Sequence, residues 1–167
     1  TSRPTPSVNT GPSGAPPGGS GHYLYAEVSS PRQPGNVFRM TYRPPTSCGA
    51  SISEIDLTYH MYGAAMGTLR VLDANGAKKC CEPELSGDQG NSWHTENRIS
   101  INSASFTIEY TRGSTWQGDA AIGLISVTCS GNVISSLSSR TGACMRRAAA
   151  NGASSMSNDD CIAGEYG

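Results

Sequence analysis

The sequence predicts an all-β protein, built as a sandwich or barrel of short strands. Short segments in which apolar and polar residues alternate recur along residues 22–128, and this period of two is typical of half-buried strands. Gly, Pro and Asn residues that favour turns separate these segments at regular spacing. No long segment has the period of an amphipathic helix. These three observations together indicate the all-β class.

The first two strands are expected within residues 22–42. The preceding residues 1–21 consist largely of Pro, Gly, Ser and Thr and have no apolar period, which is typical of a linker or a long surface loop. Residues 22–28 alternate and are rich in aromatic side chains, so we expect a strand there. Residues 36–42 repeat the pattern, and the prolines that begin at Pro44 end that strand.

Later strands follow the same pattern. Residues 55–62 alternate so that one face of the strand carries Ile55, Leu57, Tyr59 and Met61. After a strand over 68–72, the pair Asn75-Gly76 predicts a tight hairpin turn, because both central residues of a type I′ turn need positive φ. Further strands are expected at residues 97–101, 105–110 and 120–128.

The C-terminal part differs in character from the rest. Alternation is lost from Ser130 onward, and residues 145–150 are expected to form one or two helical turns, pinned by Cys144 and Cys161. The sequence therefore predicts a β-sandwich over residues 1–130 and a separate, cysteine-containing extension over residues 131–167.

Composition excludes several classes of protein. The chain has 12 basic and 13 acidic residues, and this balance argues against a nucleic-acid partner, which requires a basic surface. No stretch approaches the roughly 20 consecutive apolar residues that span a bilayer. The chain also has no initiator Met and no leader pattern, so we expect any signal peptide or membrane anchor to lie outside it.

Six cysteines form an even set with no Cys-x-x-Cys pair and no nearby histidine: Cys48, Cys80, Cys81, Cys129, Cys144 and Cys161. The even count favours disulfides in an oxidising compartment over a zinc site. Many connectivities are possible for six cysteines, and the sequence does not choose among them.

Several short motifs, in this order and spacing, make the chain resemble the MAM domain family over residues 1–130. They are Thr5-Pro-Ser7, Thr10-Gly-Pro-Ser13, Tyr23-Leu-Tyr-Ala-Glu27, Tyr59-His-Met-Tyr-Gly63, Gly67-Thr-Leu69, Ser86 to Trp93, Phe106-Thr-Ile108, Arg112-Gly-Ser114, Gly118-Asp119 and Ile122 to Val127. The resemblance implies a jelly-roll β-sandwich of two antiparallel sheets, an extracellular or cell-surface setting and a role in adhesion or oligomerisation. The opening strands of the family pattern are missing, so the domain is expected to be incomplete at its N-terminus.

Two departures from the family pattern concern acidic residues. The family often has an Asp-His-Thr triplet where this chain has Ala15-Pro-Pro17, and an Asp-Asp pair where it has Gly123-Leu124. Some family members hold a structural cation beside these positions. Hard cations need several oxygen ligands, and only Glu27 and Asp119 remain here. We therefore predict no bound metal, and we expect no cofactor.

The resemblance also implies a disulfide pairing. Cys129 lies near the closing cysteine of the family, so a bridge to Cys48 preserves the usual staple. Cys144 with Cys161 then closes the C-terminal extension. The neighbours Cys80 and Cys81 are left over, and we expect one or both to bridge to another chain or to the missing N-terminal part.

Candidate functional residues are few. His60 lies in a strand without the nucleophile and orienting acid of a catalytic set, so we interpret it as structural. Trp93 is expected to pack under the Gly-rich loop that precedes it. Trp116 lies in the loop after Arg112, and since Trp and Arg are enriched at interfaces, Trp116 with Arg112 is our candidate contact spot.

These observations favour a non-catalytic protein–protein adhesion or assembly module of a larger secreted or cell-surface protein, such as a filament or matrix subunit. Expected partners are copies of the chain itself or other extracellular glycoproteins. One alternative is a carbohydrate-binding, lectin-like module, since jelly-roll sandwiches also host lectins. Another is an accessory domain of a secreted metalloprotease or receptor phosphatase; no His-Glu-x-x-His motif is present in this chain.

Overall fold

The computed structural model describes residues 1–137 apart from 20, 46–47, 49–50 and 131, together with residues 146–147. Within this part of the chain there are strands and turns but no α-helix. The strands are β1 (Leu24–Ala26), β2 (Val37–Tyr42), β3 (Ile52–Met61), β4 (Thr68–Asp73), β5 (Lys78–Ser86), β6 (His94–Ser103), β7 (Phe106–Thr111), β8 (Ala120–Cys129), β9 (Asn132–Leu137) and β10 (Arg146–Arg147).

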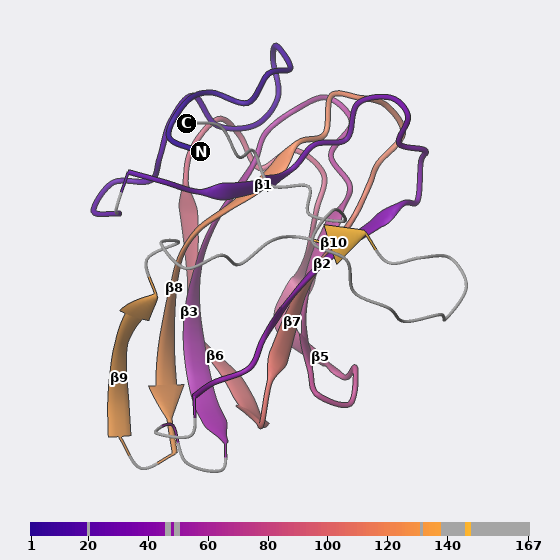
Figure 1. Cartoon of the computed structure of the whole chain (residues 1–167). Coiled ribbons are helices and arrows are strands. Elements are labelled where there is room, and N and C mark those ends of the chain that lie inside the picture. Colours follow the sequence, from indigo (N-terminus) through magenta and orange to yellow (C-terminus); the bar gives the residue numbers. More distant parts are fainter. Residues whose placement is uncertain (20, 46–47, 49–50, 131, 138–145, 148–167) are drawn as a thin grey trace.

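Two antiparallel sheets face each other (Figure 1). Sheet A has the order β1–β8–β3–β6, and β9 also pairs with β8; sheet B has the order β10–β2–β7–β4–β5. The predicted all-β, jelly-roll sandwich of two antiparallel sheets is confirmed. No helix in the described part of the chain is long and apolar enough to cross a membrane.

The core lies between the sheets and follows the alternation of the sequence. The predicted inner face of β3 is buried at all four positions, Ile55, Leu57, Tyr59 and Met61. Sheet B contributes buried residues from β2, β7 and β4 to the same core, and they include Phe38, Phe106, Ile108, Tyr110 and Leu69. Full burial of such a side chain stabilises the fold by roughly 1.5–3 kcal/mol, so the pattern that predicts the strands also supplies the driving force for pairing the sheets.

A disulfide joins Cys48 to Cys129 across 81 residues. It ties the segment before β3 to the last residue of β8, and both cysteines are buried in the core. The structure pairs the neighbours Cys80 and Cys81 with each other, rather than with another chain. Cys144 and Cys161 lie outside the described residues.

The outer face of sheet B carries a row of opposite charges across four strands. Arg39 of β2 donates from Nε to Glu109 of β7 at 2.7 Å, and Arg70 of β4 lies 3.6 Å from the other oxygen of that carboxylate. Arg70 also donates to Glu84 of β5 at 2.6 Å. Glu109 is only 6% exposed, and its position between two guanidinium groups compensates for its burial.

Strand β5 was not among the predicted strands, because its sequence has little apolar alternation and contains Pro83. It forms the edge of sheet B beside β4. Between the pairs Leu69↔Leu85 and Val71↔Cys80, β4 advances by two positions and β5 by five. Residues 81–84 therefore bulge out of the ladder.

The described parts of the C-terminal segment are strands built onto the sandwich. Residues 132–137 form β9 on β8, and residues 146–147 form β10 on β2. The helical turns expected over 145–150 are therefore wrong at 146–147, where pairing with the free edge of β2 supplies the backbone hydrogen bonds.

The described N-terminal residues, 1–19 and 21, contain no strand, and they are not a linker. They pack over the outer face of sheet A, where Ala15 and the partly buried Trp93 contact the buried Tyr23 and Ala121. The indole N–H of Trp93 donates to the carbonyl oxygen of Gly14 at 3.1 Å. This second, smaller core fixes the segment at one end of the sandwich (Figure 1).

Candidate functional site

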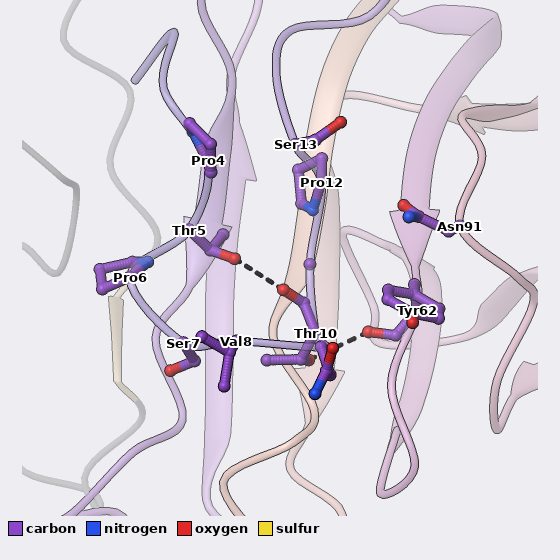
Figure 2. Close-up of a pocket in the computed structure, with 12 residues that line it drawn as sticks. Pro4, Thr5, Pro6, Ser7, Val8, Thr10, Pro12, Ser13, Tyr62 and Asn91 are labelled. Carbon is purple, nitrogen blue, oxygen red and sulfur yellow. Dashed lines mark hydrogen bonds between the residues drawn. The ribbon is translucent and has the colours of Figure 1, made fainter.

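The fixed N-terminal segment forms an open cavity at this end of the sandwich. Its volume is about 360 Å³, and it is lined by residues 4–13, Tyr62 and Asn91 (Figure 2). The lining contains proline rings, hydroxyl groups and amides, and no charged side chain. Cavities of this size hold small ligands in other proteins, and the neutral lining suits an uncharged polar ligand.

Thr10 connects the wall of this cavity to the sandwich. Its hydroxyl donates to the carbonyl oxygen of Tyr62 at 3.0 Å and accepts from the backbone N–H of Asp119 at 2.9 Å. The hydroxyl of Thr5 in turn donates to the Thr10 carbonyl at 2.8 Å (Figure 2). Three segments that are distant in sequence are thereby held at one place.

Two carboxylates, those of Asp119 and Glu27, interact electrostatically in the region of Thr10. Asp119 is completely buried; its Oδ1 accepts from the backbone N–H of Val28 at 3.1 Å, whereas Oδ2 has no hydrogen-bond partner. Glu27 accepts from the backbone N–H of Ser29 at 2.9 Å. Burial, and then the nearby charge of Glu27, raise the pKa of Asp119 to about 7, because both disfavour its charged form.

Glu27 and Asp119 are the two acidic residues that this chain keeps where the family resemblance implies a cation site. A hard cation takes six to eight oxygen ligands. The unpaired Oδ2 of Asp119 is a suitable donor, but a Cβ atom added at Gly123 would lie 2.6 Å from Cγ of Pro16. A proline ring thus fills the space into which an acidic side chain at position 123 would extend.

Arg112, one of the two candidate contact residues, lies inside the protein. It is only 7% exposed, and its Nε donates to the carbonyl oxygen of Val28 at 2.8 Å. Its own backbone N–H donates to the carbonyl of Asn36 at 2.8 Å. Arg112 therefore holds the connection between β1 and β2 in place and is not available to a partner.

Trp116, the other candidate, is on the surface. It is 42% exposed, and Val8 is the only other large hydrophobic residue exposed in the described part of the chain. The loop of Trp116 is fixed directly after the tryptophan. The carbonyl of Gln117 accepts from the backbone N–H of Ala65 at 2.9 Å, and that of Gly118 accepts from the hydroxyl of Tyr110 at 2.6 Å.

His60 is a buried residue of the outer face of sheet A. Its Nε2 lies 3.2 Å from Oδ1 of Asn91 and its ring packs at 5.3 Å against Trp93, while Nδ1 has no partner. Burial is the main cause that lowers its pKa. The partners of His60 include an amide and aromatic rings, which fits the structural role that we predicted. Trp93 packs against His60, Tyr23 and the N-terminal segment; its expected packing under the preceding Gly-rich loop stays a prediction.

Sequence reasoning missed the cavity. Residues 4–13 were interpreted by composition as a loop, and composition carries no information about which distant backbone groups Thr5 and Thr10 bind. A partial signal was present, because Thr5-Pro-Ser7 and Thr10-Gly-Pro-Ser13 belong to the motifs of the family resemblance.

An antiparallel sandwich with a disulfide staple is the architecture of many extracellular recognition modules. The profile of the family described as MAM domain, meprin/A5/mu matches residues 1–130. The chain belongs to the MAM domain family, which confirms the resemblance and agrees with the predicted extracellular or cell-surface localisation.

Relatives share about a third of the aligned residues. MAM domain-containing glycosylphosphatidylinositol anchor protein 1 of Rattus norvegicus is 36% identical over 132 residues, which are 73% of this chain and 13% of the relative. Zonadhesin of Sus scrofa is 41% identical over 63 residues, 37% of this chain and 2% of the relative. Neuropilin-1a of Danio rerio is 34% identical over 101 residues, 58% of this chain and 11% of the relative. The chain thus spans a small part of these proteins, and no solved structure matches it significantly.

Proposed function

We propose that this chain is a non-catalytic extracellular adhesion and assembly module that binds other protein molecules through its end loops. The observation that carries the proposal is Trp116, a large apolar side chain held 42% exposed on a fixed loop. Family membership over residues 1–130 supports it.

The loop of Trp116 is suited to binding because little conformational entropy remains to be lost. Gly113 and Gly118 both pack tightly on the carbonyl oxygen of Ala65, where a Cβ would lie 2.1 and 2.6 Å away. Trp residues in fixed surroundings are frequent anchors of protein interfaces. Val8 lies close in sequence to Thr10, whose hydroxyl binds Asp119, so the second exposed apolar residue is at the same end.

The expected partner is another copy of the chain or another extracellular glycoprotein. One relative is by name a glycosylphosphatidylinositol anchor protein, and another is zonadhesin. By analogy, we infer that the chain acts within a larger secreted or cell-surface protein, such as a filament or matrix subunit.

Self-association tests the proposal directly. Sedimentation equilibrium of the full chain is expected to show concentration-dependent association, and Trp116→Ala is expected to weaken it at least about tenfold, since truncation of an interface anchor costs about 2 kcal/mol or more. Thr41→Ala is the control, because Thr41 is exposed on β2 of sheet B and lies outside the end loops. A purely monomeric chain, or equal association of Trp116→Ala and wild type, contradicts the proposal for self-assembly.

The cavity favours a second candidate function, the binding of a neutral carbohydrate. Its lining of hydroxyls, amides, proline rings and Tyr62 carries no charge, and sugars are recognised by such groups together with an aromatic surface. Binding on a glycan array that is lost in Asn91→Ala would support this function. Glycan binding that depends on Trp116 instead would place the sugar on the exposed loop.

A further inference from the structure

Cys80, Cys81 and Glu96 form a cluster of metal-ligating groups on the side of the sandwich. One ligand atom from each residue lies within 4.8 Å of the other two. The cysteines belong to β5, the edge strand of sheet B, and Glu96 belongs to β6, the edge strand of sheet A. The cluster therefore joins the two sheets and is separate from the end loops.

The disulfide between the two cysteines is not a staple of the fold. Cys48 and Cys129 are 81 residues apart in sequence, whereas Cys80 and Cys81 are separated by one. A cross-link stabilises mainly by restricting the unfolded chain, and this effect grows with the length of the closed loop. A bridge between neighbours restricts almost nothing, so the pair needs another explanation.

The surroundings provide an unusual third ligand for a cysteine pair. The carboxylate of Glu96 reaches the two sulfur atoms from the opposite sheet, and the hydroxyl of Tyr59 donates to its Oε1 at 3.5 Å. Metal-ligating carboxylates are commonly oriented by such a hydrogen bond.

The spacing of the three groups suits a tetrahedral ion. Zinc binds thiolate sulfur at about 2.3 Å and carboxylate oxygen at about 2.0–2.2 Å, which places its ligand atoms roughly 3.3–3.8 Å apart. The two sulfur atoms are bonded to each other in this structure and must separate to about this distance on reduction, whereas the Glu96 oxygen, within 4.8 Å of both, must move only slightly closer. Residues 81–84 bulge out of the sheet ladder, so adjustment there does not disturb the backbone hydrogen bonds of β4.

We propose that the dithiol form of Cys80 and Cys81, together with Glu96, binds a zinc ion through three protein ligands and one water, and that the disulfide form does not. The site lies outside the end loops used in the proposed adhesion, so the two proposals are independent and can be tested separately. Bound zinc would connect β5 to β6 and hence sheet B to sheet A.

Conversion between the forms requires a reductant, a low-molecular-weight thiol. Two such thiols supply two electrons: the bond between the two sulfur atoms breaks, each takes up one proton, and the two reductant molecules leave as their own disulfide. Zinc then displaces both protons, because the thiolate is the ligand. The redox state of the pair thus decides whether the site exists.

Cobalt is a suitable probe, because thiolate ligation to Co²⁺ gives a charge-transfer absorption band and a tetrahedral visible spectrum. The full chain would carry Cys144→Ser and Cys161→Ser, so that outside the staple only Cys80 and Cys81 remain as cysteines. Mild thiol treatment is expected to free these two while Cys48–Cys129 stays closed, since both cysteines of the long disulfide are buried in the core whereas Cys81 is partly exposed; alkylation and mass spectrometry verify this. The reduced chain should then bind one Co²⁺, which zinc displaces.

Two variants make the assignment specific. Glu96→Gln is expected to weaken cobalt and zinc binding at least about tenfold, since a charged ligand is lost. Glu82→Gln is the matched control, because Glu82 is the carboxylate next to Cys81 and pairs with Lys78 at 2.6 Å rather than with the sulfur atoms. Cys80→Ser with Cys81→Ser should abolish the thiolate band.

Three results would overturn the proposal. One is the absence of a thiolate band in the reduced, folded chain, and another is equal affinity of Glu96→Gln and the control. The third is loss of the sheet signal in circular dichroism on reduction of Cys80 and Cys81 alone, because a folded dithiol form would then not exist.

Discussion

Pro16 packs directly against Gly123. A Cβ atom at position 123 would lie 2.6 Å from Cγ of Pro16 and 3.0 Å from the ring of Trp93. These are the two places where the chain departs from the acidic residues of its family, and in the structure they touch. The two departures noted in the sequence are therefore neighbours in space.

Gly123→Ala is expected to destabilise the fold by about 1–3 kcal/mol, because the added methyl group overpacks a filled space. Gly14→Ala is the matched control, since no atom lies within 4 Å of a Cβ at that position. Urea denaturation measures both. Adding Pro16→Ala to Gly123→Ala should recover part of the loss; equal effects of the two glycine substitutions would contradict the contact.

Asp119→Asn is expected to change the pH dependence of stability. The folded pKa of about 7 lies above the ordinary value of 3.8, so the folded chain binds this proton more tightly than the unfolded chain. The stabilisation is complete below about pH 4 and is lost as the pH rises through about 7, by up to about 4 kcal/mol at roughly 1.4 kcal/mol per pKa unit. Denaturation across this range should show that fall in wild type and not in Asp119→Asn.

Calcium is expected to leave the melting temperature nearly unchanged, because the remaining carboxylates do not make a full ligand set. Thermal unfolding at neutral pH with millimolar calcium or with a chelator measures this. A calcium-dependent rise in wild type that is absent in Asp119→Asn would instead establish a cation site, since a ligand stabilises the state that binds it.

His60 is expected to change the pH dependence of stability in the direction opposite to Asp119. Burial is the main cause of its lowered pKa, so the unfolded chain takes up this proton first as the pH falls. The contribution of His60 to stability is therefore complete above its unfolded pKa of about 6.5 and is lost below it. Comparison of His60→Gln with its parent, both carrying Asp119→Asn, isolates this effect; parallel curves would show that His60 does not cause it.

Removal of the long disulfide should cost far more than removal of the short one. Cys48→Ser with Cys129→Ser opens a link across 81 residues and is expected to cost about 4–5 kcal/mol in the chain-entropy model. Cys80→Ser with Cys81→Ser should change the free energy of unfolding little. Similar losses in both double variants would contradict the loop-length argument.

The strands that alternate were predictable from sequence, because a period of two directly encodes one buried face. The inner face of β3, from Ile55 to Met61, is the clearest case. Strand β5 was not predictable from sequence, because its cysteine pair and Pro83 interrupt the alternation. Its position also depends on pairing with β4. Strand β9 forms because an edge of β8 is available for pairing, and a local sequence pattern does not indicate this.

The candidate site was predictable only in part. Exposure of Trp116 agrees with its place in a Gly-rich loop, but the same reasoning put Arg112 on the surface. The structure buries Arg112 because the carbonyl of Val28, which is 84 positions away, needs a donor. Such a long-range hydrogen bond depends on the fold and cannot be predicted from the residue type alone.

Strand β5 makes sheet B a poor template for continued growth. Pro83 offers no N–H to an incoming strand, residues 81–84 bulge away from the ladder, and Glu82 projects into solvent. At high protein concentration, copies of the chain are therefore not expected to pair along the β5 edge. Contacts between copies of the chain at the β5 edge would therefore be made by side chains and not by a continued backbone hydrogen-bond ladder.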